Sequence, residues 1–313
     1  MGQRPNHSLP SSLSTGDNPI QTASIVIRRA QMKHMNSKSL VHLLSRPQQI
    51  WEILRLTGEL PKNHPEEFLS KPKSPGKVVA CLGDSITHGN VSYDWVSSLR
   101  ERFQNRDTQF INAGINGNVV WQLNQRVPRI LSCQPDVAIV LIGTNDVMGS
   151  FHHGDGRSYQ RQGKLPALPT RADYQRELRT LLRSLQRVKH VAVCTLPPLG
   201  ENPHSPINRL VVSFNENISE IVAEEHRVLL PLGKKLFDIL HQQSALPHQD
   251  YRPGPVHRLI PIVRALTDYY VHEESWDQSA SNRGLELLPD HIHLGEKAGG
   301  ILADLVSDFL EKT

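Results

Sequence analysis

The chain has 313 residues, of which 38% are hydrophobic and 21% charged, a composition typical of a globular protein and not of a fibre, a disordered chain or a membrane channel. Its net charge is +4, but the first 75 residues hold 10 of the 35 basic and 5 of the 31 acidic residues, which leaves 25 and 26 in the remainder. Because the larger part is almost neutral and aromatic residues make up only 5%, no basic and aromatic groove is evident and we expect no nucleic-acid partner.

Three cysteines, Cys81, Cys133 and Cys194, are too few for a disulfide framework and lack the paired CxxC spacing of a zinc site. The longest apolar run, Val137 to Ile142, is much shorter than a membrane span requires. The apolar segment 23–27 is also brief, and two arginines follow it where a secretory cleavage site would be expected. The sequence therefore predicts a cytoplasmic protein without a membrane span, and no pattern in it indicates an oligomeric state.

Residues 1–76 are expected to form a leader that precedes the main domain. Residues 1–35 are rich in Ser, Pro, Asn and Gln without periodicity, which predicts disorder. Apolar residues on one face predict a helix over 47–57, packed on the main domain; a membrane-surface helix is disfavoured because its polar face is not rich in Lys and Arg. Residues 61–76 are rich in Pro and Lys and predict a linker.

From residue 77 onward, short apolar runs alternate with longer amphipathic segments. Strands are predicted at Val78–Leu82, Gln109–Ile111, Val137–Ile142, His190–Cys194 and Val228–Leu232. Helices are predicted at 93–104, 119–133, 172–187, 207–225 and 295–311. This alternation indicates βαβ units, hence an α/β domain over 77–313 with a parallel sheet and helices on both faces.

Two insertions interrupt this pattern, near 147–170 and 233–289. The first contains His152 and His153 in a stretch expected to be unstructured, with Asp155 as their one nearby carboxylate. The second is too long for a plain βα connection, and its apolar residues between 256 and 270 suggest a helix that Pro261 could interrupt. Both are expected either to decorate the sheet edge or to form walls or a lid over a site.

The segment Gly83-Asp84-Ser85-Ile86-Thr87 follows the first predicted strand directly. A serine at the carboxyl end of a strand can face a ligand crevice, although it could equally be a helix cap or a turn hydroxyl. A phosphate loop is excluded because the GxxxxGK[ST] lysine is missing. A GxSxG nucleophile elbow is excluded because Thr87 stands where the second glycine should be.

Near the C-terminus, Asp290-His291-Ile292-His293 precedes the last predicted helix. In a helical or 3₁₀ turn, residues three apart are neighbours, so Asp290 can orient His293 through Nδ1 and leave Nε2 to take a proton from a serine. On that geometry His291 points elsewhere. Metal binding by Asp290, His291 and His293 is disfavoured, because no second cluster with metal-ligand spacing accompanies them.

Two further polar segments follow strands two and three. Asn145, in Gly143-Thr144-Asn145-Asp146, can donate a hydrogen bond to an oxyanion. The segment 112–118, NAGINGN, follows the second strand. Each could also be an ordinary turn, because Gly, Asn and Asp are favoured there.

Taken in order, GDSI at 83–86, NAGINGN at 112–118, GTND at 143–146 and DHIH at 290–293 resemble the four blocks of the SGNH/GDSL hydrolase family. The resemblance covers residues 77–313 and implies a flavodoxin-like three-layer α/β/α domain with about five strands. It implies Ser85 as nucleophile, His293 as base and Asp290 as the orienting acid. It also implies an oxyanion hole made by the backbone N–H groups of Ser85 and Gly117 and by the side chain of Asn145, with Gly117 preferred over Gly114. Ile86 departs from the leucine of the family name, and residues 1–76 and 233–289 lie outside its minimal pattern.

The resemblance implies a serine ester hydrolase that works through an acyl-enzyme on a small-molecule ester, with no cofactor and no metal. Lipid-like or small acyl esters are the main expectation, and O-acetyl groups on carbohydrates are the alternative. The rival from another class is a non-catalytic binding module on the same fold, which the intact Ser, Asn, Asp and His positions disfavour. A flavin- or nucleotide-binding domain is disfavoured by the missing phosphate loop. Independently of the family, a parallel sheet of order 2-1-3-4-5 has its crevice between strands one and three, which end beside Ser85 and Asn145.

Overall fold

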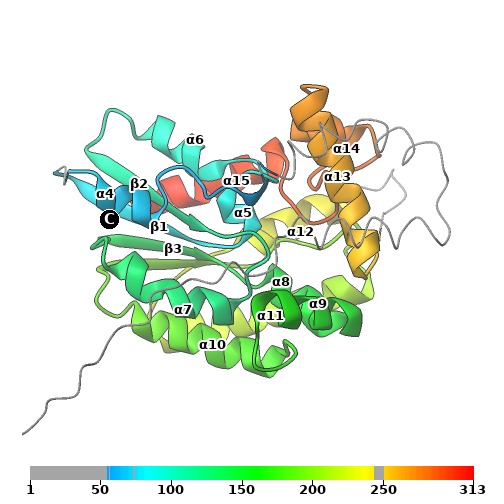
Figure 1. Ribbon diagram of the computed structural model, residues 1–313, viewed down its shortest axis with the longest axis horizontal. Coiled ribbons are helices and arrows are strands. Elements are labelled where there is room, and N and C mark those ends of the chain that lie inside the picture. Colours follow the sequence, from blue (N-terminus) through cyan, green and yellow to red (C-terminus); the bar gives the residue numbers. More distant parts are fainter. Residues whose placement is uncertain (1–54, 56, 73–74, 243–249) are drawn as a thin grey trace, which may run out of the picture. The chain divides into compact units, whose positions relative to one another are not determined.

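A computed structural model describes residues 55, 57–72, 75–242 and 250–313, and a five-stranded parallel sheet of order β2-β1-β3-β4-β5 lies at its centre (Figure 1). The strands are β1 Lys77–Gly83, β2 Thr108–Gly114, β3 Val137–Leu141, β4 His190–Cys194 and β5 Val228–Leu230. The predicted α/β class and parallel sheet are thus confirmed. The fifth strand is shorter than predicted because helix α12, Leu232–Gln242, begins two residues after it.

The three neighbouring strands β2, β1 and β3 end level with one another. Gly83 pairs with Gly114 on one side and with Leu141 on the other. All five residues of β3 are buried, which explains why this strand is a continuous apolar run: a parallel sheet is covered by helices on both faces. The polar segments that follow these strands therefore meet at one edge of the sheet.

Helices cover both faces of the sheet (Figure 1). One face carries α6 Trp95–Arg102, α12 Leu232–Gln242 and α15 Glu296–Leu310; the other carries α7 Val120–Leu131, α10 Arg171–Ser184 and α11 Pro206–Glu224. Each of the five helices predicted from periodicity is present, with its bounds shifted by a few residues at most.

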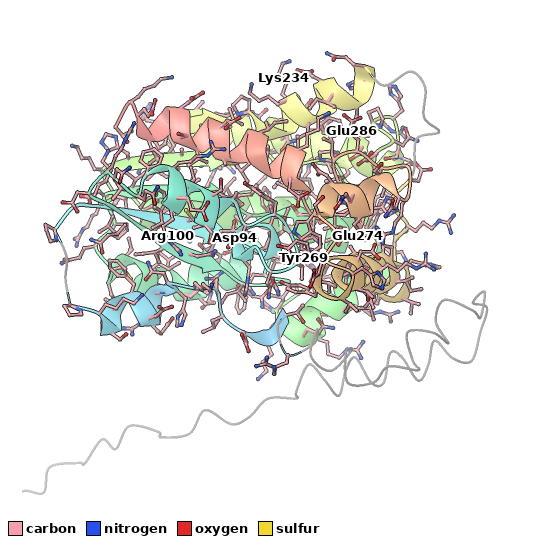
Figure 2. The ribbon with its side chains drawn as sticks, turned by 90° about the horizontal axis from the view of Figure 1, so that it is seen from above. Asp94, Arg100, Lys234, Tyr269, Glu274 and Glu286 are labelled. Atoms are coloured by element: carbon pink, nitrogen blue, oxygen red, sulfur yellow. The ribbon has the colours of Figure 1, made fainter. Side chains whose placement is uncertain are left out.

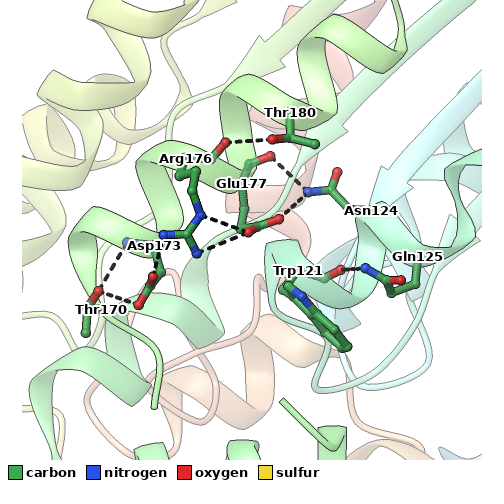
Figure 3. A network of polar contacts seen from close by, with 8 residues as sticks. All are labelled: Trp121, Asn124, Gln125, Thr170, Asp173, Arg176, Glu177 and Thr180. Carbon is green, nitrogen blue, oxygen red and sulfur yellow. Dashed lines mark hydrogen bonds and ion pairs between the residues drawn. The ribbon is translucent and has the colours of Figure 1, made fainter. Parts of the chain in front are cut away.

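The α7–α10 pair shows how apolar and polar contacts combine in these layers. Val120, Leu123 and Val127 lie on one buried face of α7, as a helical period requires. On the outer side, the Asn124 amide of α7 donates to the Glu177 backbone carbonyl at 3.0 Å and to its carboxylate at 2.8 Å (Figure 3). A buried face with polar links at its margin fixes α10 against α7.

Four further helices lie in the two insertions, at the carboxyl side of the sheet (Figure 1). They are α8 Thr144–Phe151, α9 His153–Gly163, α13 Pro255–Val271 and α14 Trp276–Ser281. The prediction that His152 and His153 lie in an unstructured stretch is wrong. The His152 ring accepts a hydrogen bond from the Asp155 backbone N–H and caps α9, which begins at His153. Helix α13 runs through Pro261 without interruption.

Helices α13 and α14 pack against each other through aromatic rings. Tyr269 of α13, which Figure 2 labels, stacks on Trp276 of α14, with ring centroids 4.2 Å apart and planes 9° from parallel. Trp276 is buried while Tyr269 is partly exposed. The two helices are therefore joined by an aromatic contact that leaves part of the Tyr269 ring at the surface.

The predicted linker 61–76 contains a helix, α4 Pro65–Ser70, which has proline at its first position and Glu66 and Glu67 in its first turn, all favourable at a helix start. Residues 55–313 group into one compact unit. The predicted disorder of 1–35 and most of the predicted helix 47–57 lie outside the described residues. Among the helices described, none combines the length and the apolar character needed to cross a membrane.

Candidate active site

Ser85 begins the short helix α5, Ser85–His88, directly after β1. The Asp84 carboxylate accepts the Ile86 backbone N–H at 3.0 Å and caps this helix. The chain must turn sharply here, and a Cβ at Gly83 would collide with the Thr87 side chain and with the backbone carbonyl of Leu141. Strand β1 and the Asp84 cap thus hold the serine hydroxyl at the carboxyl edge of the sheet.

His293 joins Ser85 to Asp290 although 208 residues separate the serine from the histidine. Its Nε2 lies 2.8 Å from Ser85 Oγ, and its Nδ1 lies 2.6 Å from Asp290 Oδ2. An ionised carboxylate can only accept, so Nδ1 carries the hydrogen and Nε2 presents its lone pair to the serine hydroxyl. All three side chains are buried. The arrangement can therefore move a proton from Ser85 to His293.

The Asp290–His293 contact does not come from a helical turn, as the spacing suggested. His291 has a positive φ of 72°, so the chain turns through the left-handed region between the two residues. Asp290 Oδ1 accepts the backbone N–H groups of Ile292 at 3.0 Å and His293 at 2.8 Å. Burial raises the pKa of Asp290, but the His293 imidazole and these donors outweigh it and hold the pKa below its usual value. The carboxylate consequently stays ionised.

A buried carboxylate that the sequence did not single out anchors the segment leading to Asp290. Glu201, which follows β4, accepts the backbone N–H groups of Glu286, Leu287 and Leu288, with nearest distances of 2.8, 2.7 and 2.9 Å. Only 4% of Glu201 is exposed. In the sequence, Glu201 could have been recognised only as a charged residue shortly after the carboxyl end of a predicted strand. Glu201 fixes the turn that delivers Asp290 and His293 to Ser85.

The third and fourth polar segments meet beside this group. Asn145 is the second residue of α8 and donates through Nδ2 to the Asn118 carbonyl at 2.9 Å, while Asp84 Oδ2 lies 3.4 Å away. The Asn145 amide thus lies between Asn118, which follows Gly117, and Asp84, which precedes Ser85. Gly117 has a positive φ of 75° in an exposed turn. Gly114 instead donates its N–H to the Asn112 side chain at 3.0 Å, so that group is already engaged.

A second set of residues that the sequence did not single out lies behind Asn145. The Tyr159 hydroxyl of α9 is 2.7 Å from Asn145 Oδ1, and Arg258 Nη1 of α13 is 2.8 Å from the same hydroxyl. Arg258 also pairs with the buried Asp155 carboxylate at 3.2 Å. No spacing pattern links these residues in the sequence, because Arg258 and Asp155 are 103 positions apart. Both insertions therefore reach the site.

Two other buried carboxylates flank the serine and asparagine. Burial raises the pKa of Asp84 to about 6. Burial likewise raises the pKa of Asp146, which accepts the Val120 backbone N–H at 3.1 Å. Within the part of the chain that the structure describes, no three His, Cys, Asp or Glu side chains are grouped as a metal site. The polar groups around Ser85 are hydrogen-bond donors and acceptors suited to acyl transfer.

Solved structures with a similar fold include the acetylxylan esterase Axe2 from Geobacillus stearothermophilus. It is 16% identical, with a TM-score of 0.52 over 75% of this chain and 94% of that chain. A mutant of Axe2 from Geobacillus, described as an acetyl-xylooligosaccharide esterase, is 17% identical, with a TM-score of 0.52 over 76% and 95%. At this identity the likeness establishes the fold, and it agrees with the predicted SGNH three-layer domain.

Comparison with curated protein sequences gives no match. The sequence profile of the GDSL-like Lipase/Acylhydrolase family matches residues 81–258, which is more than half of the chain. This match confirms the resemblance seen in the four sequence blocks. The protein is a carboxylic ester hydrolase that belongs to the GDSL-like lipase/acylhydrolase family.

Proposed function

We propose that the hydrolase works through an acyl-enzyme formed on Ser85. Ser85 Oγ attacks the ester carbonyl while His293 Nε2 accepts its proton, and Asp290 stabilises the resulting imidazolium. His293 then returns the proton to the leaving alcohol. A water molecule attacks the acyl-enzyme with His293 again as base. The observation that supports this mechanism is the continuous chain of 2.8 and 2.6 Å contacts from Ser85 through His293 to Asp290.

The proposed oxyanion hole consists of the backbone N–H groups of Ser85 and Gly117 and the Nδ2 amide of Asn145. The proposal is supported by the position of the Asn145 amide between Asp84, next to Ser85, and Asn118, next to Gly117. One Asn145 amide hydrogen goes to Asn118, and the other faces Asp84 only at 3.4 Å, too long for a strong N–H···O bond. That hydrogen, which makes no strong bond to Asp84, is the one proposed to donate to the developing oxyanion.

For the substrate we propose an O-acetyl ester on a carbohydrate in preference to a lipid acyl ester. The support is the fold shared with enzymes described as acetylxylan and acetyl-xylooligosaccharide esterases. The apolar part of α13, which would have favoured an acyl chain, packs partly onto neighbouring helices: Ala265 and Leu266 are buried, and Tyr269 stacks on Trp276. We also propose residues 77–313 as the catalytic domain, with 1–76 as its leader.

The test compares p-nitrophenyl esters from acetate to palmitate with acetylated xylooligosaccharides. The proposal expects kcat/KM to be highest for acetate and to fall as the acyl chain lengthens, with acetate released from the oligosaccharides. A maximum at eight carbons or more would favour lipid acyl esters instead.

The catalytic assignment is tested with Ser85→Ala and, as a control on neighbouring helix α6, Ser98→Ala. Ser85→Ala and His293→Ala should lower turnover by roughly 10⁴–10⁶, and Asn145→Ala by about 10²–10³. A fluorophosphonate should label the parent protein and Ser98→Ala at Ser85. Undiminished turnover by Ser85→Ala would overturn the assignment, and absence of labelling would favour a non-catalytic binding module.

A further inference from the structure

A buried polar chain runs from the two insertions to the proposed oxyanion donor Asn145. It begins at Asp155, whose carboxylate is fully buried and holds the backbone N–H of Gly254 at 2.8 Å and Arg258 Nη1 at 3.2 Å. Arg258 Nη1 contacts the Tyr159 hydroxyl at 2.8 Å, and that hydroxyl contacts Asn145 Oδ1 at 2.7 Å. Each of these contacts has the length of a good hydrogen bond.

The Arg258 guanidinium fixes the direction of every hydrogen bond from Tyr159 to Asn145. A guanidinium only donates, so the Tyr159 oxygen must accept from Arg258. The single hydroxyl hydrogen of Tyr159 is then directed at Asn145 Oδ1. This in turn fixes which end of the Asn145 amide is oxygen and which is nitrogen, and it places Nδ2 toward Asn118 and the neighbour of Ser85.

Burial makes this orientation costly to lose. Tyr159 is 6% exposed and Asn145 is 5% exposed, so an unpaired amide or hydroxyl there would not be compensated by water. Burial also raises the pKa of Tyr159, which keeps its hydroxyl hydrogen in place. The Arg258 guanidinium lies over the Tyr159 ring, 4.8 Å from its centroid, and the Asp155 carboxylate balances its charge. Hydrogen bonds in such a chain polarise one another, so donation to Oδ1 strengthens Nδ2 as a donor.

We propose that Tyr159 and Arg258 are positioning residues of the hydrolase: they orient and polarise the Asn145 amide for the oxyanion, with Asp155 holding Arg258 in place. The inference rests on the proposed role of Asn145 and extends it to the insertions. Neither residue touches the reacting atoms. Their contribution is made in the transition state, where the charge on the oxyanion develops, and it therefore acts on kcat more than on KM.

The test is a double-mutant cycle on purified full-length protein with p-nitrophenyl acetate. Tyr159→Phe should lower kcat about 5- to 20-fold, the effect of weakening one hydrogen bond in a buried site, with KM changed less than 2-fold. In an Asn145→Ala background the same change should lower kcat less than 2-fold, because the amide that it serves is gone. Arg258→Met should lower kcat about 3- to 10-fold, since it frees the hydroxyl to rotate.

Tyr174→Phe is the matched control. Tyr174 is also a buried phenol. Its hydroxyl donates at 3.0 Å to the backbone carbonyl of Ile142, which lies three residues before Asn145, and not to the Asn145 side chain. Its loss should leave kcat within 2-fold. An equal kcat loss in Tyr159→Phe with and without Asn145, or an equal loss in Tyr174→Phe, would overturn the positioning role.

These outcomes are separate from failure of the proposed function. If Ser85→Ala retains turnover, the acyl-enzyme mechanism fails, whatever Tyr159→Phe does. If Ser85→Ala is inactive while the Tyr159 and Asn145 effects are independent, the mechanism stands and the positioning role fails. Circular dichroism and urea unfolding of each variant verify that the kcat values come from folded protein.

Discussion

Removing the Glu201 carboxylate should both destabilise the protein and slow it. Glu201 Oε1 accepts the backbone N–H groups of Glu286, Leu287 and Leu288, at 3.0, 2.7 and 2.9 Å, and Oε2 accepts the first of them again at 2.8 Å. Glu201→Ala leaves three backbone donors without this acceptor, each costing about 1–3 kcal/mol. We expect a loss of at least about 3 kcal/mol in the free energy of unfolding. Glu201→Gln can keep its oxygen at the Oε1 position and should cost only about 1–2 kcal/mol.

The assay combines urea unfolding with kcat for an aryl acetate. Because the three donors lie two to four residues before Asp290, we expect kcat to fall about 10-fold or more in Glu201→Ala, and less in Glu201→Gln. Glu216→Ala, an exposed change of the same type on α11, should alter stability by less than about 0.5 kcal/mol. A loss below 1 kcal/mol in Glu201→Ala, together with unchanged kcat, would refute the view that this carboxylate holds the Asp290 segment.

Two further predictions concern Asp84 and a pair of glycines. The pKa of Asp84 is raised by burial from 3.8 to about 6, so the ionised carboxylate opposes folding, and this cost is absent below about pH 4 and complete above about pH 6. Asp84→Asn should therefore raise the free energy of unfolding by about 3 kcal/mol at pH 8 and by about half as much at pH 5 in urea titrations; a gain that is constant with pH would contradict this. A Cβ at Gly114 would collide with the His88 backbone nitrogen, whereas nothing lies within 4 Å of a Cβ at Gly117, whose φ is +75°. We expect Gly114→Ala to lower the free energy of unfolding by more than about 3 kcal/mol and to abolish most of the activity. Gly117→Ala should lower the free energy of unfolding by about 1–2 kcal/mol and kcat by less than 10-fold. Thermal unfolding and kcat of both variants test this, and equal effects would disagree with this geometry.

The sheet could be predicted because parallel strands buried on both faces leave a direct mark in the sequence. The run Val137–Leu141 is apolar at every position, and its neighbours are apolar over nearly their whole length. The order of the strands then brings their carboxyl ends together. The grouping of Ser85, Asp290 and His293 expected from the motifs agrees with the observed contacts, while their catalytic roles stay predictions to be tested by substitution.

Helix α9 could not be predicted in the same way, because its buried face is not apolar. That face consists of Asp155, Gly156 and Tyr159. Because aspartate is mostly exposed in proteins, the sequence pattern does not indicate that Asp155 lies on a buried helix face. Its burial depends on Arg258, which comes from α13 far along the chain. The Asp290 turn shows a related difference: the three-residue spacing predicted the contact, but the backbone makes it through the left-handed His291 instead of a helix.

The ion pair between Asp155 and Arg258 has a consequence for exchanging segments between members of this family. Asp155 is fully buried on α9 and its cation comes from α13, so either insertion transplanted alone would carry an uncompensated charge into the receiving protein. Breaking such a pair by removing one partner costs about 3–5 kcal/mol, a large fraction of the stability of an ordinary domain. Chimaeras should therefore move residues 144–163 and 250–271 together, and chimaeras that move only one of the two should express poorly.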